Sequence, residues 1–300
     1  MPLKQSYFPE SGVWLKGNLH SHTTVSDGCY SPEELARLYA DKGYDFLSMT
    51  DHNLSVPHRE LPEEQIILLT GVEHDIEYSP YKCVHAVGIS ALGKTETDYE
   101  CRRYSPEEMT PQQMVDMMHD DGQFVALVHP VWSRMDPEEI LSMRNIDAVE
   151  IYNNGMEHMC HGGNAEVYWD LMLNRGMRVL ATATDDVHVP DDLFGGWIWV
   201  KAAARTRSAI LSALRAGHFY PSSGPQIFDF GLEDGKVYAS CSPCRAIHFV
   251  SYEPRGKSFF AEAGEPITQA SYRLTGTERY VRAVCVDEQG YPAWSQPIFF

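Results

Sequence analysis

The sequence predicts an α/β fold, either a parallel barrel or a doubly wound sheet, followed by a small antiparallel β-sandwich. Short apolar runs alternate with capped helical patterns over the first part of the chain, as in proteins that build parallel sheets. Most of these runs lack strict alternation, which is typical of strands buried on both faces. After residue 225 helical patterns disappear, and Gly and Pro separate short strand-like runs. We therefore expect one unit over residues 1–224 and a second over residues 225–300.

The apolar runs define the expected strands. In the first unit the predicted strands cover residues 14–20, 46–50, 65–73, 84–89, 124–129, 148–152, 178–184 and 197–201. In the second unit they cover residues 237–239, 246–251, 271–274, 280–286 and 298–300.

Helix start signals lie between several of these strands. Ser31, Thr110 and Asp136 each precede a proline, and each is followed three positions later by Glu or Gln. A capping side chain with proline at the first helical position and Glu or Gln at the third is a typical helix start. Residues 206–217 predict one more amphipathic helix. The expected helix ends are Gly43, Gly122 and Gly176.

Composition limits the class of protein. Of the 300 residues, 43% are hydrophobic and 22% are charged, which argues against disorder. The net charge of −18 disfavours a stable nucleic-acid or membrane partner, because both favour a basic surface. No run approaches the roughly 18 apolar residues that span a bilayer, and residues 1–7 lack a secretory signal. The sequence thus predicts a cytoplasmic protein and leaves the oligomeric state open.

The cysteines do not predict a disulfide framework, because the 7 of them are scattered and odd in number. Cys241 and Cys244 form a C-x-x-C pair, a pattern found in zinc and redox sites. No second pair of this kind accompanies it. We therefore expect an inert turn between two strands.

Histidines and carboxylates recur at the predicted C-terminal ends of the strands. His20 and His22 are two residues apart, so both imidazoles face one side of a strand and can reach one ion. Asp186 and His188 repeat this spacing. Parallel α/β folds build their active sites at this edge, and mixed imidazole and carboxylate donors suit zinc, iron or manganese better than calcium. The other candidates are Asp27, His52, Glu73, His85 and His129.

Three segments resemble a known family. The run Gly17-Asn-Leu-His-Ser-His-Thr23, with Ser26-Asp-Gly28 and Thr50-Asp-His-Asn53, closely resembles the polymerase and histidinol phosphatase (PHP) family. This family is a branch of metal-dependent, amidohydrolase-like hydrolases. The resemblance covers residues 14–220 and implies a distorted (β/α)7 TIM-like barrel.

The resemblance also implies a trinuclear site of divalent metals, with zinc, iron or manganese as the expected ions. The implied ligands are His20, His22, Glu73 and Asp186 for the first ion, Glu73 again with His85 and His129 for the second, and Asp27, His52 and His188 for the third.

Two of these ligands have sequence competitors. His74 competes with His85, but Glu73 and His74 are adjacent in a strand and face opposite sides, which favours His85. Asp185 competes with Asp186, and the two-residue spacing to His188 favours Asp186.

The implied reaction is hydrolysis by metal-activated hydroxide, in which the ions also stabilise charge on the leaving group. The predicted catalytic residues are Glu73, Asp186 and His188. Arg134, just after His129, is a candidate phosphate clamp, and a solvated surface arginine is the alternative. His161 lies in a Gly-rich segment, where a substrate contact competes with an ordinary loop position.

Three functions remain open at this stage. The first is a phosphoesterase that acts on a small phosphorylated metabolite or nucleotide. The second is the same metal site cleaving a carboxyl ester, amide or carbamate. The third is a metal-binding module without catalysis. Every ligand position implied by the resemblance is occupied by a ligand-type residue, which favours an enzyme over a non-catalytic module. Among the enzymes, the metal chemistry favours the phosphoesterase.

Overall fold

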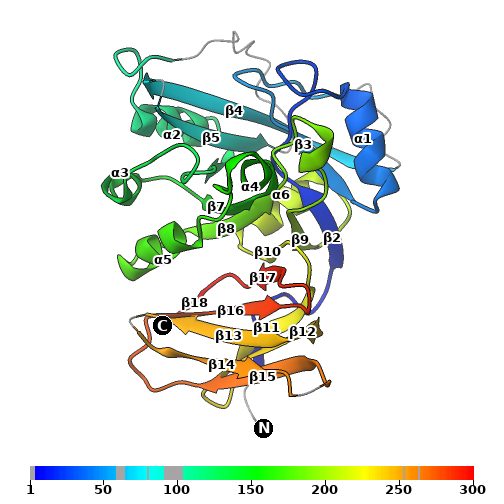
Figure 1. The fold of residues 1–300 in the computed structure, drawn as a ribbon, viewed down its shortest axis with the longest axis vertical. Helices are drawn as coiled ribbons and strands as arrows, with labels where there is room; N and C mark the ends of the chain where they lie inside the picture. The colour runs from blue at the N-terminus through cyan, green and yellow to red at the C-terminus, as the bar shows by residue number, and fades with distance from the viewer. Residues whose placement is uncertain (1–3, 59–64, 80, 91–103, 253, 263) are drawn as a thin grey trace.

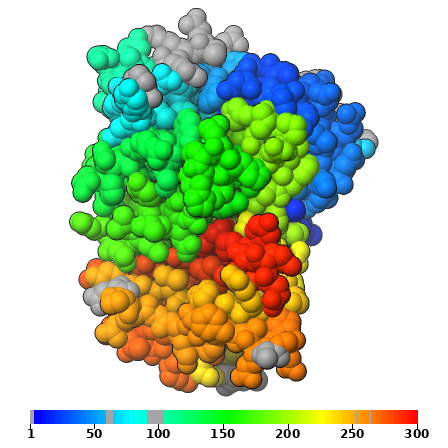
Figure 2. All heavy atoms as spheres, viewed as in Figure 1, coloured from blue at the N-terminus to red at the C-terminus, as the bar shows by residue number. Residues whose placement is uncertain are grey.

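The computed structural model describes residues 4–58, 65–79, 81–90, 104–252, 254–262 and 264–300. It is a mixed α/β protein in which the N-terminal part carries the helices and the C-terminal part is built of strands. Figure 1 shows the C-terminal strands below the first unit, and Figure 2 shows that the two parts pack against each other along a broad contact.

One large sheet forms the centre of the first unit. Its strands run in the order β9-β2-β3-β4-β5-β6-β7-β8. The last strand, β8, also contacts β9 and β10, so the two ends of this order approach each other. The strands are β2 (Val13–Asn18), β3 (Phe46–Met49), β4 (Ile67–Ser79), β5 (Lys82–Ser90), β6 (Phe124–Leu127), β7 (Ala148–Asn153), β8 (Leu180–Thr184) and β9 (Trp197–Ala202).

The expectation of parallel strands throughout is wrong. β2, β3 and β4 pair in parallel, as do β6, β7 and β8. β5 is antiparallel to both β4 and β6, and β9 is antiparallel to β2. The sequence obscured this because β4 continues well past residue 73 and the register runs to Ser79 opposite Lys82. So short a connection can join only antiparallel strands.

The helices begin where the capping signals predict. The Ser31 hydroxyl accepts from the amide of Glu34 at 3.3 Å, and the Thr110 hydroxyl accepts from that of Gln113 at 3.2 Å. The segment 153–163, expected to be a loop, instead contains α4, which is capped by the Asn153 side chain. The helices are α1 (Pro32–Asp41), α2 (Pro111–Asp120), α3 (Pro137–Ser142), α4 (Asn154–Cys160), α5 (Glu166–Asn174), α6 (Arg207–Arg215) and the 3-10 turn η1 (Pro190–Asp192).

The residues after 225 pair only in antiparallel ladders in the described part of the chain. One sheet has the order β1-β11-β12-β15, and the strands β14-β13-β16-β17 continue through β10 into the large sheet. The strands are β1 (Lys4–Ser6), β10 (Phe219–Ser222), β11 (Ile227–Glu233), β12 (Lys236–Cys244), β13 (Ala246–Ser251), β14 (Gly256–Phe260), β15 (Ile267–Arg273), β16 (Tyr280–Val286), β17 (Pro292–Trp294) and β18 (Ile298–Phe299).

The C-x-x-C pair does not lie in a turn. Cys241 and Cys244 are both part of β12, and the register of β12 against β15 shifts between Ser240 and Cys244. Such a shift lets both thiols point into the same core. Cys101 lies outside the described residues.

Polar contacts join the two parts of the molecule. The buried guanidinium of Arg282 on β16 binds Asp170 at 2.8 Å and Glu166 at 2.7 Å on α5. The Gln296 side chain pairs with both backbone groups of Ala181 on β8. Among the described residues, no helix has the length and apolar character needed to cross a membrane.

Candidate metal centre

The site begins where the first strand of the large sheet ends. The Asn18 side chain accepts from the backbone amide of His20 at 3.0 Å and donates to the carbonyl of Gly196 at 3.0 Å. His20 and His22 are both buried, and the intervening Ser21 forms a parallel bridge to Val187. The two-residue spacing therefore directs both imidazoles inward, as expected for a strand.

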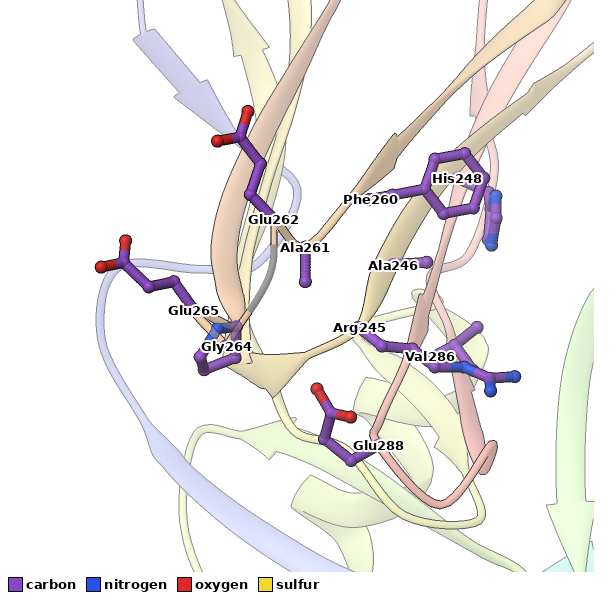
Figure 3. Close-up of a pocket in the computed structure, with 11 residues that line it drawn as sticks. Arg245, Ala246, His248, Phe260, Ala261, Glu262, Gly264, Glu265, Val286 and Glu288 are labelled. Atoms are coloured by element: carbon purple, nitrogen blue, oxygen red, sulfur yellow. The ribbon is translucent and has the colours of Figure 1, made fainter.

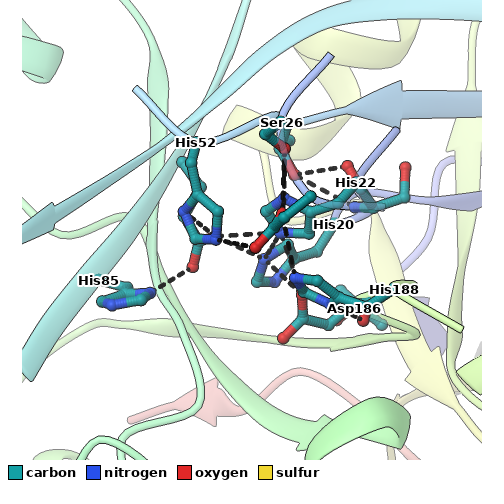
Figure 4. Close-up of polar contacts among 12 residues, drawn as sticks. His20, His22, Ser26, His52, His85, Asp186 and His188 are labelled. Atoms are coloured by element: carbon teal, nitrogen blue, oxygen red, sulfur yellow. Dashed lines mark hydrogen bonds and ion pairs between the residues drawn. The ribbon is translucent and has the colours of Figure 1, made fainter. Parts of the chain in front are cut away.

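Histidines and carboxylates from several strand ends converge in one buried cluster (Figure 4). The cluster contains four overlapping groups, and within each group the ligand atoms lie within 4.8 Å of one another. Together the four groups include all of the implied ligands. The groups are His22, Asp27, His52 and His188; His20, His22 and Glu73; His20, His129 and Asp186; and His52, Glu73 and His85.

Glu73 lies at the centre of the cluster. Its Oε1 is 2.8 Å from the Nδ1 of His85 and 3.0 Å from the Nε2 of His129. Its Oε2 is 3.1 Å from the Nε2 of His22 and 3.4 Å from that of His20. The two oxygens thus face two different sets of imidazoles, which is the arrangement that a bridging carboxylate requires.

Asp186 and Asp27 complete the ring of acceptors. Oδ1 of Asp186 is 3.1 Å from His20 and 3.2 Å from His22. Asp27 is half exposed at the rim, where its oxygens are 3.4 Å from His188 and 3.5 Å from His52. The cluster therefore runs from a buried floor at Asp186 to an open edge at Asp27.

The competing residues point elsewhere. The imidazole of His74 contacts the Asn53 side chain at 3.1 Å, whereas that of His85 contacts Glu73. Asp185 accepts from the amides of residues 194–196 and from the hydroxyl of Tyr39 at 2.5 Å. Asp185 thus anchors a neighbouring loop, while Asp186 faces the cluster.

The pKa values show how strongly the cluster attracts positive charge. Burial alone lowers the pKa of His22, but hydrogen bonds to Asp186 and Glu73 raise it to about 9. The pKa values of His20 and His85 also lie well above the usual range. Burial lowers both, but carboxylates outweigh it at His20, and Glu73 with the Cys83 thiol outweighs it at His85. Burial raises the pKa of Glu73, but the surrounding imidazoles lower it far more.

The donor set fits divalent metal ions. The Nε2 atoms of His20 and His22 face each other at 3.3 Å inside the same ring of carboxylate oxygens. Two imidazole nitrogens that face each other need a cation or a proton between them, and mixed nitrogen and oxygen donors are typical of zinc, iron and manganese sites.

A loop on one side of the cluster is held by Asp51. Its carboxylate accepts from the amide of Thr23 at 2.8 Å and from the hydroxyl of Ser26 at 2.8 Å. These contacts fix the loop that carries Asp27. Asp51 therefore orients the loop beside the cluster and belongs to none of the ligand groups.

Two residues of the site were missed by the sequence analysis. Glu150 is fully buried on β7, and its carboxylate contacts His20 at 3.1 Å and the amide of His129 at 2.9 Å. Asn153 donates to both Glu150 and Asp186, at 2.8 and 3.0 Å. The sequence did carry a signal for Glu150, because it is the one charged residue in the apolar run Ala148–Asn153. A charged side chain is rarely buried without a partner, so its position indicates a polar contact inside the protein.

Part of this cluster lines a cavity with a volume of about 290 Å³. Of the residues that Figure 4 labels, His52, His85, Asp186 and His188 belong to its lining. The apolar residues of its lining are Trp132, Met156 and Met159. The Trp132 ring packs edge-on against the imidazole of His129, with centroids 5.0 Å apart. The cavity lining thus combines charged and apolar side chains.

The two candidate substrate residues do not line this cavity. Arg134 is exposed and lines an adjoining cavity of about 640 Å³, which shares Glu77, Cys83 and Trp132 with the first. The His161 side chain is 92% exposed and binds Glu157 one helical turn earlier. The structure therefore brings the expected ligands together and leaves Arg134 and His161 outside the cluster.

A larger cavity of about 920 Å³ lies in the C-terminal part (Figure 3). Arg245, His248, Phe260 and Glu288 are among its lining residues. Arg245 is exposed, and none of the ligand groups includes a residue of this cavity. This cavity is larger than the histidine cavity, and its described lining residues take no part in the ligand groups.

Comparisons with known proteins identify similar chains. No family model matches the sequence. A segment of 39 residues, 13% of this chain, is 46% identical to the DNA polymerase/3′-5′ exonuclease PolX of Bacillus subtilis and spans 7% of it. A segment of 79 residues, 24% of this chain, is 33% identical to the 5′-3′ exoribonuclease Rnm of Escherichia coli and spans 27% of it. The chain thus covers only a minor part of either protein.

The similarity in fold extends over nearly the whole chain. The crystal structure of a two-domain protein from Bacteroides vulgatus, described as containing a predicted PHP-like metal-dependent phosphoesterase, superposes with a TM-score of 0.51. The match covers 99% of this chain and 97% of that chain at 14% sequence identity. At this identity the comparison establishes the fold.

Proposed function

This chain has the fold of a PHP-like protein, as its opening motif predicts, and from that premise we propose that it is a metal-dependent hydrolase of phosphate esters. The position of Glu73 supports the proposal most directly. One buried carboxylate presents Oε1 to His85 and His129 and Oε2 to His20 and His22. A carboxylate so placed can hold two cations side by side, which is the arrangement used to cleave phosphate esters.

We propose three divalent ions, with zinc, iron and manganese as the candidates. Glu73 and Asp186 would hold the buried ions together with the imidazoles around them, and Asp27 would hold the third ion with His52 and His188. When bound, such ions activate water as a nucleophile and stabilise negative charge on phosphate oxygens. The catalytic roles fall to Glu73, Asp186 and His188.

The protein itself positions the substrate and keeps water away from part of it. Exposure increases from Asp186 to Asp27, whose side chain is 50% exposed, so the substrate enters at the rim. Trp132 and Met156 exclude water from one side of the cavity, which strengthens electrostatic interactions with the substrate.

Arg134 fits a more distal part of the substrate. Its cavity adjoins the histidine cavity through Glu77, Cys83 and Trp132. A substrate longer than a simple phosphate ester reaches that guanidinium with an anionic group. We therefore retain Arg134 as a binding residue for the far end of the substrate and assign no role to His161.

The finer description of the fold supports the same site. We propose that the large sheet is a distorted barrel, because β8 contacts β9 and β10 at the opposite end of the strand order. We assign residues 1–224 to the barrel unit and residues 225–300 to the β unit. The exception is β1, which lies at the N-terminus but pairs with β11 of the β unit. Every implied ligand lies in the first of these units.

A substrate panel tests the function. Hydrolysis is measured at fixed Mn²⁺ or Zn²⁺ concentration for phosphate monoesters, phosphodiesters, a single-stranded oligonucleotide, carboxyl esters, amides and carbamates. The oligonucleotide is included because PolX and Rnm are nucleases by name. We expect metal-dependent cleavage of phosphate esters. Selective cleavage of carboxyl esters, amides or carbamates, or no cleavage of any substrate by fully metal-loaded protein, would overturn the proposal.

A further inference from the structure

Behind the imidazoles of the cluster lies a second layer of polar contacts centred on Glu150. The side chain is fully buried on β7 and belongs to none of the ligand groups. Its Oε1 contacts the Nδ1 of His20 at 3.1 Å and accepts from the hydroxyl of Thr184. Its Oε2 accepts from the amide of His129 at 2.9 Å and from Asn153 at 2.8 Å.

These contacts connect Glu150 to three implied ligands. His20 is contacted directly through its ring. His129 is contacted through its backbone amide, at a residue with the unusual φ of +29°. Asp186 is reached through Asn153, whose amide group donates to Glu150 and to Asp186 at 3.0 Å. A single buried carboxylate is thus placed to fix the orientation of side chains from three different strand ends.

We propose that Glu150 is a positioning residue that sets the tautomer of His20 for metal binding. The proposal rests on the proposed metal centre and concerns metal binding, not the bond that is cleaved. A carboxylate can only accept, so it keeps a proton on Nδ1 of His20. The lone pair of the neutral ring then lies on Nε2, which points at Glu73 and Asp186 from 3.4 and 3.1 Å.

The substitution Glu150→Gln has a specific expected consequence. The Oε2 position faces two N–H groups that can only donate, the amide of His129 and the side-chain amide of Asn153. The oxygen of the glutamine must therefore stay there, and its NH₂ group must face His20 and Thr184. Donation to Nδ1 of His20 moves the ring proton to Nε2 and removes the lone pair from the metal cavity.

The test measures metal binding directly. Zn²⁺ affinity is determined by competition with a fluorescent chelator, and the absorption spectrum of the Co²⁺-loaded protein reports the coordination geometry. We expect Glu150→Gln to lose roughly 10- to 100-fold in affinity for the most affected ion and to show an altered Co²⁺ spectrum. Unchanged affinity together with an unchanged spectrum would refute the proposal.

A conservative variant separates positioning from packing. Glu150→Asp keeps a carboxylate and loses one methylene, whereas Glu150→Gln keeps the size and loses the charge. If Glu150 acts as an acceptor, the aspartate variant retains more metal affinity than the glutamine variant. If Glu150 only fills space, the order is reversed and the proposal fails.

A matched control comes from the C-terminal part. Glu278 is also buried, and it accepts from the Tyr272 hydroxyl at 2.6 Å and from the amide of Gly276 at 2.9 Å. Glu278→Gln makes the same chemical change far from the histidines. It should lower thermal stability and leave Zn²⁺ affinity within about twofold of the wild-type value, the scatter expected of an uncoupled site.

The wild-type protein provides a measurement that does not depend on folding of a variant. In the Zn²⁺-loaded protein, ¹⁵N NMR should show a proton on Nδ1 of His20 and the metal-bound shift on Nε2. Metal coordination through Nδ1, or an unprotonated Nδ1, would overturn the role of Glu150 even if Glu150→Gln did not fold. Both results are independent of which ester the protein hydrolyses.

Discussion

Two clusters of residue types that bind metals can be compared in the described part of the chain, and they differ in what surrounds them. In the first unit, imidazoles converge on Glu73 and Asp186. In the C-terminal unit, the thiols of Cys241 and Cys244 are 3.7 Å apart in an apolar core that also holds Cys285. None of the groups with ligand atoms within 4.8 Å includes a cysteine, within the described residues.

The electrostatic surroundings explain the difference. Carboxylates around His20 and His22 raise the pKa of each imidazole and favour positive charge in the cavity. The contact with Cys241 and burial both raise the pKa of the Cys244 thiol. The surroundings therefore favour positive charge in the first cluster and neutral thiols in the second.

The two cavities differ in the same way. The C-terminal cavity of about 920 Å³ is larger than the histidine cavity of about 290 Å³, yet its charged residues do not converge on a common point (Figure 3). Each region has an arginine near its cavity, Arg134 in the first unit and Arg245 in the second. The histidine cluster can therefore be compared with the thiol cluster by substitution, and Arg134 with Arg245.

The largest expected effect follows from neutralising Glu73. Glu73→Gln keeps the size but replaces one acceptor oxygen with an amide that a cation repels. We expect at least about a hundredfold loss of turnover together with loss of bound metal, since both sets of imidazoles share this carboxylate. Hydrolysis and metal content are measured on the same samples, with Glu278→Gln as the control. Near-normal turnover at full metal occupancy would exclude the bridging role.

The second effect is a dependence of stability on pH that only metal-free protein should show. The folded protein holds a proton on His22 with a pKa of about 9, against a usual value of 6.5. A raised pKa contributes stability that is complete below pH 6.5 and is lost as the pH rises through about 9. Between pH 6.5 and 8.5, the midpoint of thermal unfolding should therefore fall by about 5 °C in chelated protein.

Metal replaces that proton, so metal-loaded protein should not lose stability over the same interval. The thiol cluster should change stability little over this interval, because the ordinary pKa of a thiol, 9.0, lies above it and Cys244 keeps its proton in both the folded and the unfolded protein. Thermal unfolding of the chelated and loaded forms at several pH values makes the comparison. If the unfolding midpoints of the two forms changed with pH in parallel, the proton that metal displaces would not be the one on the histidines.

The sequence placed the candidate ligands in space more successfully than it placed the strands. Local spacing was enough to bring His20 and His22 to one side of the chain, because residues two apart in an extended segment share a side. The antiparallel position of β5 depends on the extension of β4 to Ser79, which no local pattern marks. The role of Glu150 depends on contacts with residues 130 and 34 positions away, which spacing cannot reveal.

Cys241 and Cys244 show the same limit of local sequence patterns. The expected turn was wrong, because the register shift within β12 allows the strand to continue through Pro243. A bulge depends on the partner strand β15 and is not visible in the residues of β12 alone.

A third, smaller effect is expected in the thiol cluster. Cys244→Ala removes one buried sulfur and leaves a small cavity, which should cost about 1 kcal/mol of unfolding free energy. Metal content and hydrolysis should stay at wild-type levels. Chemical denaturation and metal analysis of the variant test both expectations. Loss of bound metal on this change would place a metal in the C-terminal core and erase the contrast between the two clusters.

The smallest effect is expected at the rim, where the two arginines can be compared. Arg134 lies beside the histidine cavity but outside the ligand groups, so its removal should not change metal content. One exposed guanidinium that contacts an anionic substrate is worth about 1 kcal/mol, or roughly a fivefold change in KM. Arg134→Ala should therefore raise KM several-fold for phosphate esters with a distal anionic group and leave kcat nearly unchanged. Arg245→Ala removes the same charge beside the C-terminal cavity and should change neither constant. Equal effects of the two variants would mean that net charge, and not a contact at the metal cavity, governs substrate binding.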